Sequence, residues 1–133
     1  MPVATADDLA GIPLFDRLEA EERATIAPWF ELQDITPGVN LTGEGASGYS
    51  FFVLRAGNAT VSVGGAEVGT LEPGDFFGEL ALLGDGRRTA TVTTASPAKV
   101  LVLFGTEFRR LQQEYPELAA RIESALRESA QAA

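Results

Sequence analysis

The chain of 133 residues contains no cysteine and no histidine. Without cysteine it forms no disulfide, offers no thiolate to a metal ion and performs no thiol catalysis. Without histidine it lacks the commonest metal ligand and the commonest general base of enzymes. We therefore expect no catalytic residue, no metal-binding residue and no cofactor, and we interpret the chain as a protein that is not an enzyme.

Basic residues are also scarce, with 10 Lys and Arg against 19 Asp and Glu, so the net charge is −9 and the pI is near 4.4. Nucleic acids and anionic membranes are bound through clustered Lys and Arg, so this balance argues against both as partners. No apolar run approaches the roughly 18 residues that a membrane span needs. Residues 1–8 lack the basic start and apolar core of a signal peptide, so we expect a cytoplasmic protein.

The length and the 45% apolar content predict a single globular domain that spans residues 1–133. We expect N-terminal helices in residues 1–32, a β-roll in 33–104 and C-terminal helices in 105–133. The predicted class is α+β and mainly β, with an antiparallel roll of the jelly-roll type between the two sets of helices.

Apolar spacing and helix breakers predict the helices. Leu18, Ile26 and Trp29 predict an amphipathic helix whose first turn is acidic, and Pro28 should kink or tighten its last turn. Pro116 suits the first turn of a final helix. That helix carries an apolar stripe formed by Leu118, Ile122 and Leu126. Its polar face carries two predicted i, i+4 ion pairs, Glu117–Arg121 and Glu123–Arg127. The stripe has three open uses: packing on the roll, covering a ligand, or pairing with another chain.

Turn residues at short intervals predict the strands of the roll. Gly64-Gly65 lies between two β-prone runs, 59–63 and 66–71, and is typical of a two-residue hairpin. Further strands are expected at 50–55, 89–95 and 99–104.

The segment 76–92 is predicted to hold a turn, a one-turn helix that bears Glu79, a glycine-bounded loop and then a strand, with Arg88 at the entrance to that strand. The start of a helix offers unpaired N–H groups and partial positive charge to a phosphate. An arginine from the next strand can grip the same phosphate through two hydrogen bonds. The glutamate suits sugar hydroxyls instead, so the segment favours a ligand with both a phosphate and a sugar hydroxyl.

This segment resembles the phosphate-binding cassette of cyclic nucleotide-binding domains, which occur in regulatory subunits of cyclic-nucleotide-dependent kinases, catabolite-activator-type regulators and gated channels. The cassette motif Phe-Gly-Glu-Leu-Ala-Leu occupies residues 77–82, and its second part, Arg-Thr-Ala-Thr-Val, occupies residues 88–92. Residues 13–18 and 42–57 are similar to the first helices and early strands of the family. The resemblance covers nearly the whole chain, so we expect no effector domain within it.

The resemblance implies a 3′,5′-cyclic nucleotide as ligand, with cAMP favoured over cGMP. Arg88 would bind the exocyclic phosphate, although a one-residue loop shift would give that role to Arg87. Glu79 would accept a hydrogen bond from the ribose 2′-hydroxyl. The other implied ligand contacts, through backbone N–H groups or a hydroxyl, come from Gly78, Leu80, Thr89 and Ala90. Either Phe52 or Val53 would line the sugar side, and alternation alone leaves that choice open.

Each of these residues also has a plain structural interpretation. A strand arginine is commonly a surface charge, and a glutamate in the first turn of a helix is favourable without any ligand. Thr89 is an ordinary β-branched strand residue. Glu44 and Asp75 stand in turns, where carboxylates commonly bind backbone amides, so we do not interpret them as a catalytic pair.

Taken together, these features indicate a regulatory module that relays nucleotide binding through its C-terminal helices to a separate protein effector or to a second copy. The alternatives are a ligand-blind interaction domain and a fragment of a larger cyclic-nucleotide-regulated protein. A small β-roll enzyme of the cupin type would need histidine and carboxylate metal ligands, and the chain has no histidine.

Overall fold

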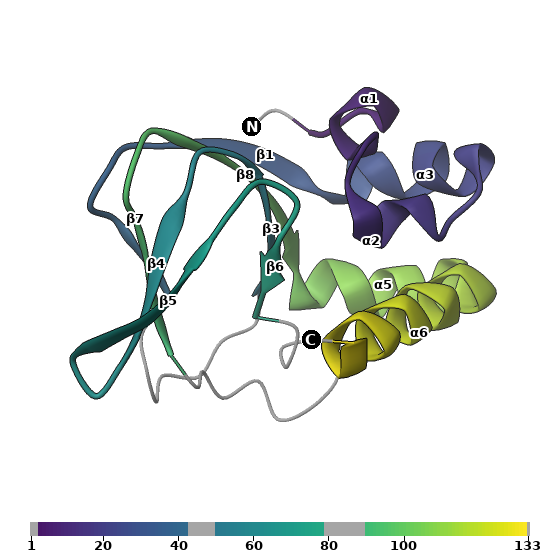
Figure 1. The fold of residues 1–133 in the computed structure, drawn as a ribbon. Coiled ribbons are helices and arrows are strands. Elements are labelled where there is room, and N and C mark those ends of the chain that lie inside the picture. Colours follow the sequence, from purple (N-terminus) through teal and green to yellow (C-terminus); the bar gives the residue numbers. More distant parts are fainter. Residues whose placement is uncertain (1–2, 43–49, 79–89, 133) are drawn as a thin grey trace.

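The computed structural model describes residues 3–42, 50–78 and 90–132. A roll of two antiparallel sheets forms one part of the molecule, and a layer of helices covers one side of it (Figure 1). The predicted fold class, an antiparallel β-roll with helices at both ends of the chain, is confirmed.

The N-terminal helices are short and begin with local caps. They comprise α1 (Ala6–Leu9), α2 (Pro13–Asp16), α3 (Ala20–Ile26) and the 3₁₀ turn η1 (Ala27–Trp29). Capping boxes satisfy orphan N–H groups at the starts of α1 and α3. Pro28 lies in η1, which confirms the predicted tightening after α3.

The first sheet has the strand order β1-β8-β3-β6 and the second has the order β2-β7-β4-β5. Every described strand pair is antiparallel. The strands of the first sheet are β1 (Glu31–Ile35), β8 (Ala98–Phe104), β3 (Ser50–Ala56) and β6 (Phe76–Phe77). Those of the second are β2 (Asn40–Thr42), β7 (Thr91–Thr94), β4 (Ala59–Val63) and β5 (Ala66–Leu71).

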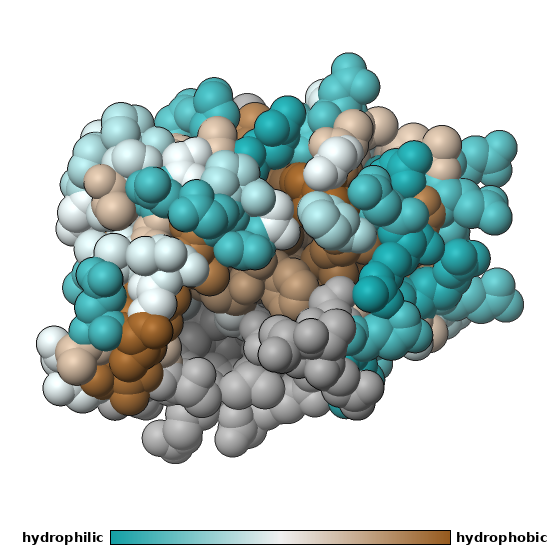
Figure 2. All heavy atoms as spheres, viewed as in Figure 1, coloured by the Kyte–Doolittle hydropathy of each residue, from teal (hydrophilic) through white to brown (hydrophobic). Residues whose placement is uncertain are grey.

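The hairpin predicted at Gly64-Gly65 is confirmed, because these two residues connect β4 to β5. Both have positive φ, 61° and 82°, as a type I′ turn requires. Beside the turn, Val63 and Val68 are exposed, and apolar colour marks this hairpin tip in Figure 2.

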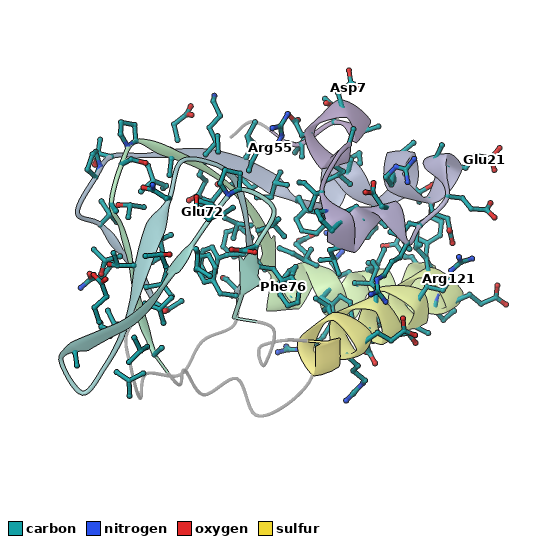
Figure 3. The ribbon with its side chains drawn as sticks, in the orientation of Figure 1. Asp7, Glu21, Arg55, Glu72, Phe76 and Arg121 are labelled. Atoms are coloured by element: carbon teal, nitrogen blue, oxygen red, sulfur yellow. The ribbon has the colours of Figure 1, made fainter. Side chains whose placement is uncertain are left out.

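Strand β3 divides the apolar core into two clusters. Phe52 and Leu54 point into the space between the two sheets, whereas Phe51 and Val53 point toward the helices. Phe52 thus faces the inside of the roll, whereas Val53 faces the helices. Phe76, on the neighbouring strand β6, packs against the helical cluster, and Figure 3 shows it beside the helices.

The C-terminal helices are α5 (Gly105–Glu114) and α6 (Pro116–Ala132), so Pro116 begins the final helix as predicted. The apolar stripe of α6 is buried within this chain, in the cluster between the helices and the outer face of the first sheet. Of the three uses open to the stripe, packing on its own domain is the one observed.

The predicted ion pairs on the polar face of α6 were wrong. Arg121 pairs with Glu22 of α3 at 3.1 Å instead of with Glu117. Glu123 accepts a hydrogen bond from Gln112 of α5 at 3.0 Å. These side chains meet partners from other helices because α6 packs beside α3 and α5, which spacing along one helix does not reveal.

None of the helices in the described parts of the chain is both long enough and apolar enough to cross a membrane.

Candidate functional site

The structure describes two of the predicted ligand-binding residues, Gly78, which follows β6, and Ala90, which precedes β7, and we refer to them as the boundary residues of the candidate site. The end of β6 and the start of β7 lie at the same end of the roll (Figure 1). These two strands belong to different sheets, so the two boundary residues bring both sheets to the site. Of the six predicted ligand-binding residues, Gly78 and Ala90 are placed by the structure. The other four lie outside the described residues: Glu79, Leu80, Arg88 and Thr89.

The first boundary is held by two stacked rings. Phe77 pairs with Phe52 across β6 and β3, and their ring centroids are 4.9 Å apart with an interplanar angle of 9°. Both rings are at least nine-tenths buried in the cluster between the sheets. Because Phe77 directly precedes Gly78, this stack fixes the position from which the cassette begins.

Gly78 has a φ of 79°, in the left-handed region that side chains with a Cβ rarely adopt. Glycine is therefore required by the backbone here, whatever ligand role it also has. The positive φ at the residue after β6 is thus a local reason for glycine at this point of the cassette motif.

The second boundary is held by a hydroxyl. Thr42, the last residue of β2, donates from Oγ1 to the carbonyl oxygen of Ala90 at 3.1 Å. The next residue, Thr91, begins β7, which lies between β2 and β4 in the second sheet. Sequence reasoning did not find Thr42, since a threonine before a turn has many ordinary roles and its partner stands 48 residues away.

The carboxylates considered for catalysis receive a structural explanation where they are described. Asp75 accepts a hydrogen bond from the backbone N–H of Glu72 at 2.8 Å, so it stabilises the turn before β6. Glu44 lies outside the described residues. Within the described part of the chain, no group of three acidic side chains could hold a metal ion.

Aromatic contacts connect the N-terminal helices to the corner between α5 and α6. Trp29 of η1 makes an edge-to-face contact with Tyr115 at 6.4 Å between centroids, and the guanidinium of Arg110 lies 5.4 Å from the Trp29 ring. Arg17, the residue that follows α2, also forms an ion pair with Glu128 of α6. These contacts hold the terminal helices against the N-terminal ones, and Figure 2 shows the hydrophilic outer surface of this helical layer.

Comparison with known proteins places this site in a family. The family described as the cyclic nucleotide-binding domain matches residues 32–115, a range that contains both boundaries of the site. A cAMP-dependent protein kinase regulatory subunit from Colletotrichum orbiculare is 40% identical over 107 residues, which cover 79% of this chain and 27% of the relative. A cGMP-dependent protein kinase from Toxoplasma gondii is 36% identical over 99 residues, 74% of this chain and 10% of that kinase.

A solved structure has the same fold. The regulatory domain of Toxoplasma gondii PKA, crystallised with cAMP, superposes with a TM-score of 0.79 at 25% identity and covers 96% of this chain and 49% of that one. The chain thus spans about a quarter or less of the two curated relatives named above. The family match extends over more than half of this chain, from β1 to the end of α5. The chain belongs to the cyclic nucleotide-binding domain family.

Proposed function

We propose that this domain is a regulatory module whose preferred ligand is cAMP. The observation that carries the proposal is the family match over residues 32–115, which contains the complete cassette motif at 77–82 and 88–92. The relatives named as regulatory subunits of cAMP-dependent kinases favour cAMP, and so does the similar domain crystallised with cAMP. A relative named for cGMP keeps cGMP as the competing ligand.

In this proposal the phosphate is held by Arg88 together with backbone N–H groups at both ends of the cassette. Glu79 accepts a hydrogen bond from the ribose 2′-hydroxyl, and Thr89 adds a hydroxyl near the phosphate or the base. The positive φ of Gly78 supports the proposed phosphate contact at the first end of the cassette, because a residue without a Cβ lets the backbone come close to a ligand. The backbone donors are those of Gly78, Leu80 and Ala90.

Ligand binding is proposed to reposition α5 and α6. Phe76 supports this route: it stands two residues before Gly78, and its ring packs against the cluster that includes Phe108 of α5. A movement of the backbone at the start of the cassette could therefore be transmitted to α5 through the packing of Phe76. Signalling through this path requires that the nucleotide bind one arrangement of the helices more tightly than the other.

The output is proposed to reach a separate protein, and no catalytic role is assigned to this domain. The relatives' name, regulatory subunit of a protein kinase, supports a kinase catalytic chain as the effector. A homodimer through α6 is the alternative; since the apolar stripe is buried within the chain, such a dimer would use the polar face of α6. A cytoplasmic location and the extent of one domain over residues 1–133 remain part of the proposal.

Isothermal titration calorimetry with cAMP and then cGMP tests the proposal, with Arg88→Ala and Arg87→Ala as matched variants. We expect saturable binding that is tighter for cAMP. Loss of Arg88 should cost about 2–5 kcal/mol of binding free energy, because a phosphate left without its charged partner is poorly compensated. Arg87→Ala should bind nearly as the wild type does, and the reverse result would assign the phosphate to Arg87.

Two outcomes contradict the proposal. Binding that survives Arg88→Ala and Arg87→Ala alike would place the nucleotide elsewhere. If neither nucleotide bound at millimolar concentration, the cassette would serve structure alone, and a ligand-blind interaction domain would become the better interpretation of this roll.

A further inference from the structure

Two polar side chains are buried among the described residues, and both are threonines. Thr42 is 8% exposed and Thr94 is 2% exposed. A buried hydroxyl needs a hydrogen-bond partner, since an unpaired polar group in the interior is costly. Each of these hydroxyls has one, and the two sets of partners lie near opposite ends of strand β7.

Thr42 holds the start of β7. Its Oγ1 donates to the carbonyl oxygen of Ala90 at 3.1 Å, one residue before the strand begins. The described backbone pairing of β2 with β7 runs from Asn40, opposite Thr93, to Thr42, opposite Val92. The Thr42 hydroxyl therefore bonds to the carbonyl of Ala90, which lies two residues before Val92, the residue opposite Thr42 in the strand pairing.

Thr94 holds the end of β7. Its Oγ1 donates to the carbonyl oxygen of Thr36 at 2.7 Å and accepts from the backbone N–H of Val39 at 2.9 Å. These bonds fix the turn that enters β2, at the end of β7 away from Ala90. Thr94 thus provides a matched control: it is the same residue type on the same sheet and is also buried, but it does not contact a boundary residue of the site.

We propose that Thr42 is a positioning residue for the cyclic nucleotide, acting through the backbone at Ala90. The inference rests on the proposed function, in which Ala90 offers its N–H to the phosphate two residues after Arg88. The Thr42 hydroxyl fixes the carbonyl of Ala90 and so restricts the backbone at the exit of the cassette. A donor held in place before the ligand arrives loses less conformational entropy on binding, which favours affinity.

Calorimetric titration with cAMP tests this with Thr42→Val, Thr42→Ser and Thr94→Val, and urea unfolding of each variant measures stability. Valine matches the size of threonine and removes the hydroxyl. We expect Thr42→Val to raise the Kd about 3- to 10-fold, the effect of one neutral hydrogen bond. Thr42→Ser, which keeps the hydroxyl, should stay within about twofold of the wild type. Thr94→Val should lower the urea midpoint at least as much as Thr42→Val and leave the Kd within about twofold.

Three results overturn the inference. Equal Kd values for Thr42→Val and Thr94→Val would make Thr42 a purely structural residue. A Thr42→Ser variant as weak as Thr42→Val would show that the hydroxyl is not the cause. If the wild type does not bind cAMP, the proposed function is wrong and this inference is wrong with it. The wild-type titration distinguishes this outcome from a failure of the Thr42 inference alone. If Thr42→Val does not fold, Thr42→Ala replaces it in the same comparison.

Discussion

Two glycines with nearly the same backbone angle should respond very differently to alanine. Gly57, between β3 and β4, has a φ of 83°, and Gly65, in the β4–β5 turn, has a φ of 82°. A Cβ on Gly57 would lie 2.4 Å from the carbonyl oxygen of Pro97 and 2.8 Å from the Cα of Ala98. A Cβ on Gly65 would meet nothing within 4 Å. The pair thus separates backbone strain from steric overlap.

The expected magnitudes follow from these contacts. Alanine in the left-handed region costs about 1–2 kcal/mol of folding free energy, and the stiffer unfolded chain returns about 0.4–1 kcal/mol. Gly65→Ala should therefore destabilise the fold by no more than about 1.6 kcal/mol. Gly57→Ala must also displace the backbone at Pro97 and Ala98, and overpacking of this kind adds about 1–3 kcal/mol.

The free energy of unfolding in urea measures both variants, and a constant m-value would show that the unfolded states are comparable. We expect Gly57→Ala to lose about 2–4 kcal/mol in total, well beyond the loss in Gly65→Ala. Equal losses in the two variants would refute the reasoning, because they would mean that the loop at Pro97 moves away without cost.

Two further predictions concern the helical layer. Leu126→Ala, at a fully buried position, should cost about 2–5 kcal/mol of unfolding free energy in urea titration. By contrast Arg17→Ala, which breaks an ion pair whose side chains are 40% and 66% exposed, should cost less than about 1 kcal/mol, and less again in high salt; a larger loss would give this pair an unexpected structural role. Trp29 is the one tryptophan of the chain and contacts the α5–α6 corner, so its fluorescence should change when cAMP is added and should not change in Arg88→Ala. An unchanged spectrum at saturation would contradict the proposed movement of these helices.

Local features of the chain were predictable because their causes are local. The hairpin depends on two adjacent glycines with positive φ, the 3₁₀ turn on Pro28, and the start of α6 on Pro116. Each is decided by the dihedral angles that one or two residues permit. The glycine of the cassette motif has a similar cause, since the positive φ at Gly78 favours glycine at that point of the sequence.

The site was only partly predictable. The structure describes Gly78 and Ala90 of the six predicted residues, and the ligand roles of all six remain predictions. Thr42 could not be predicted as part of the site, because its hydroxyl donates to a carbonyl 48 residues away and no local sequence pattern connects the two residues. Contacts between distant segments depend on strand register, and a register is a property of two strands together.

The sequence by itself thus determined the type of fold, most turns and the family, because periodicity, turn residues and a long motif act over short distances. Only the tertiary structure decided which faces meet. Phe51, Phe52, Val53 and Leu54 are all at least nine-tenths buried, so alternation of polar and apolar residues could not tell the inside of the roll from the side that packs on the helices. The same holds for Arg121, whose partner on α3 becomes available only when α6 packs beside it.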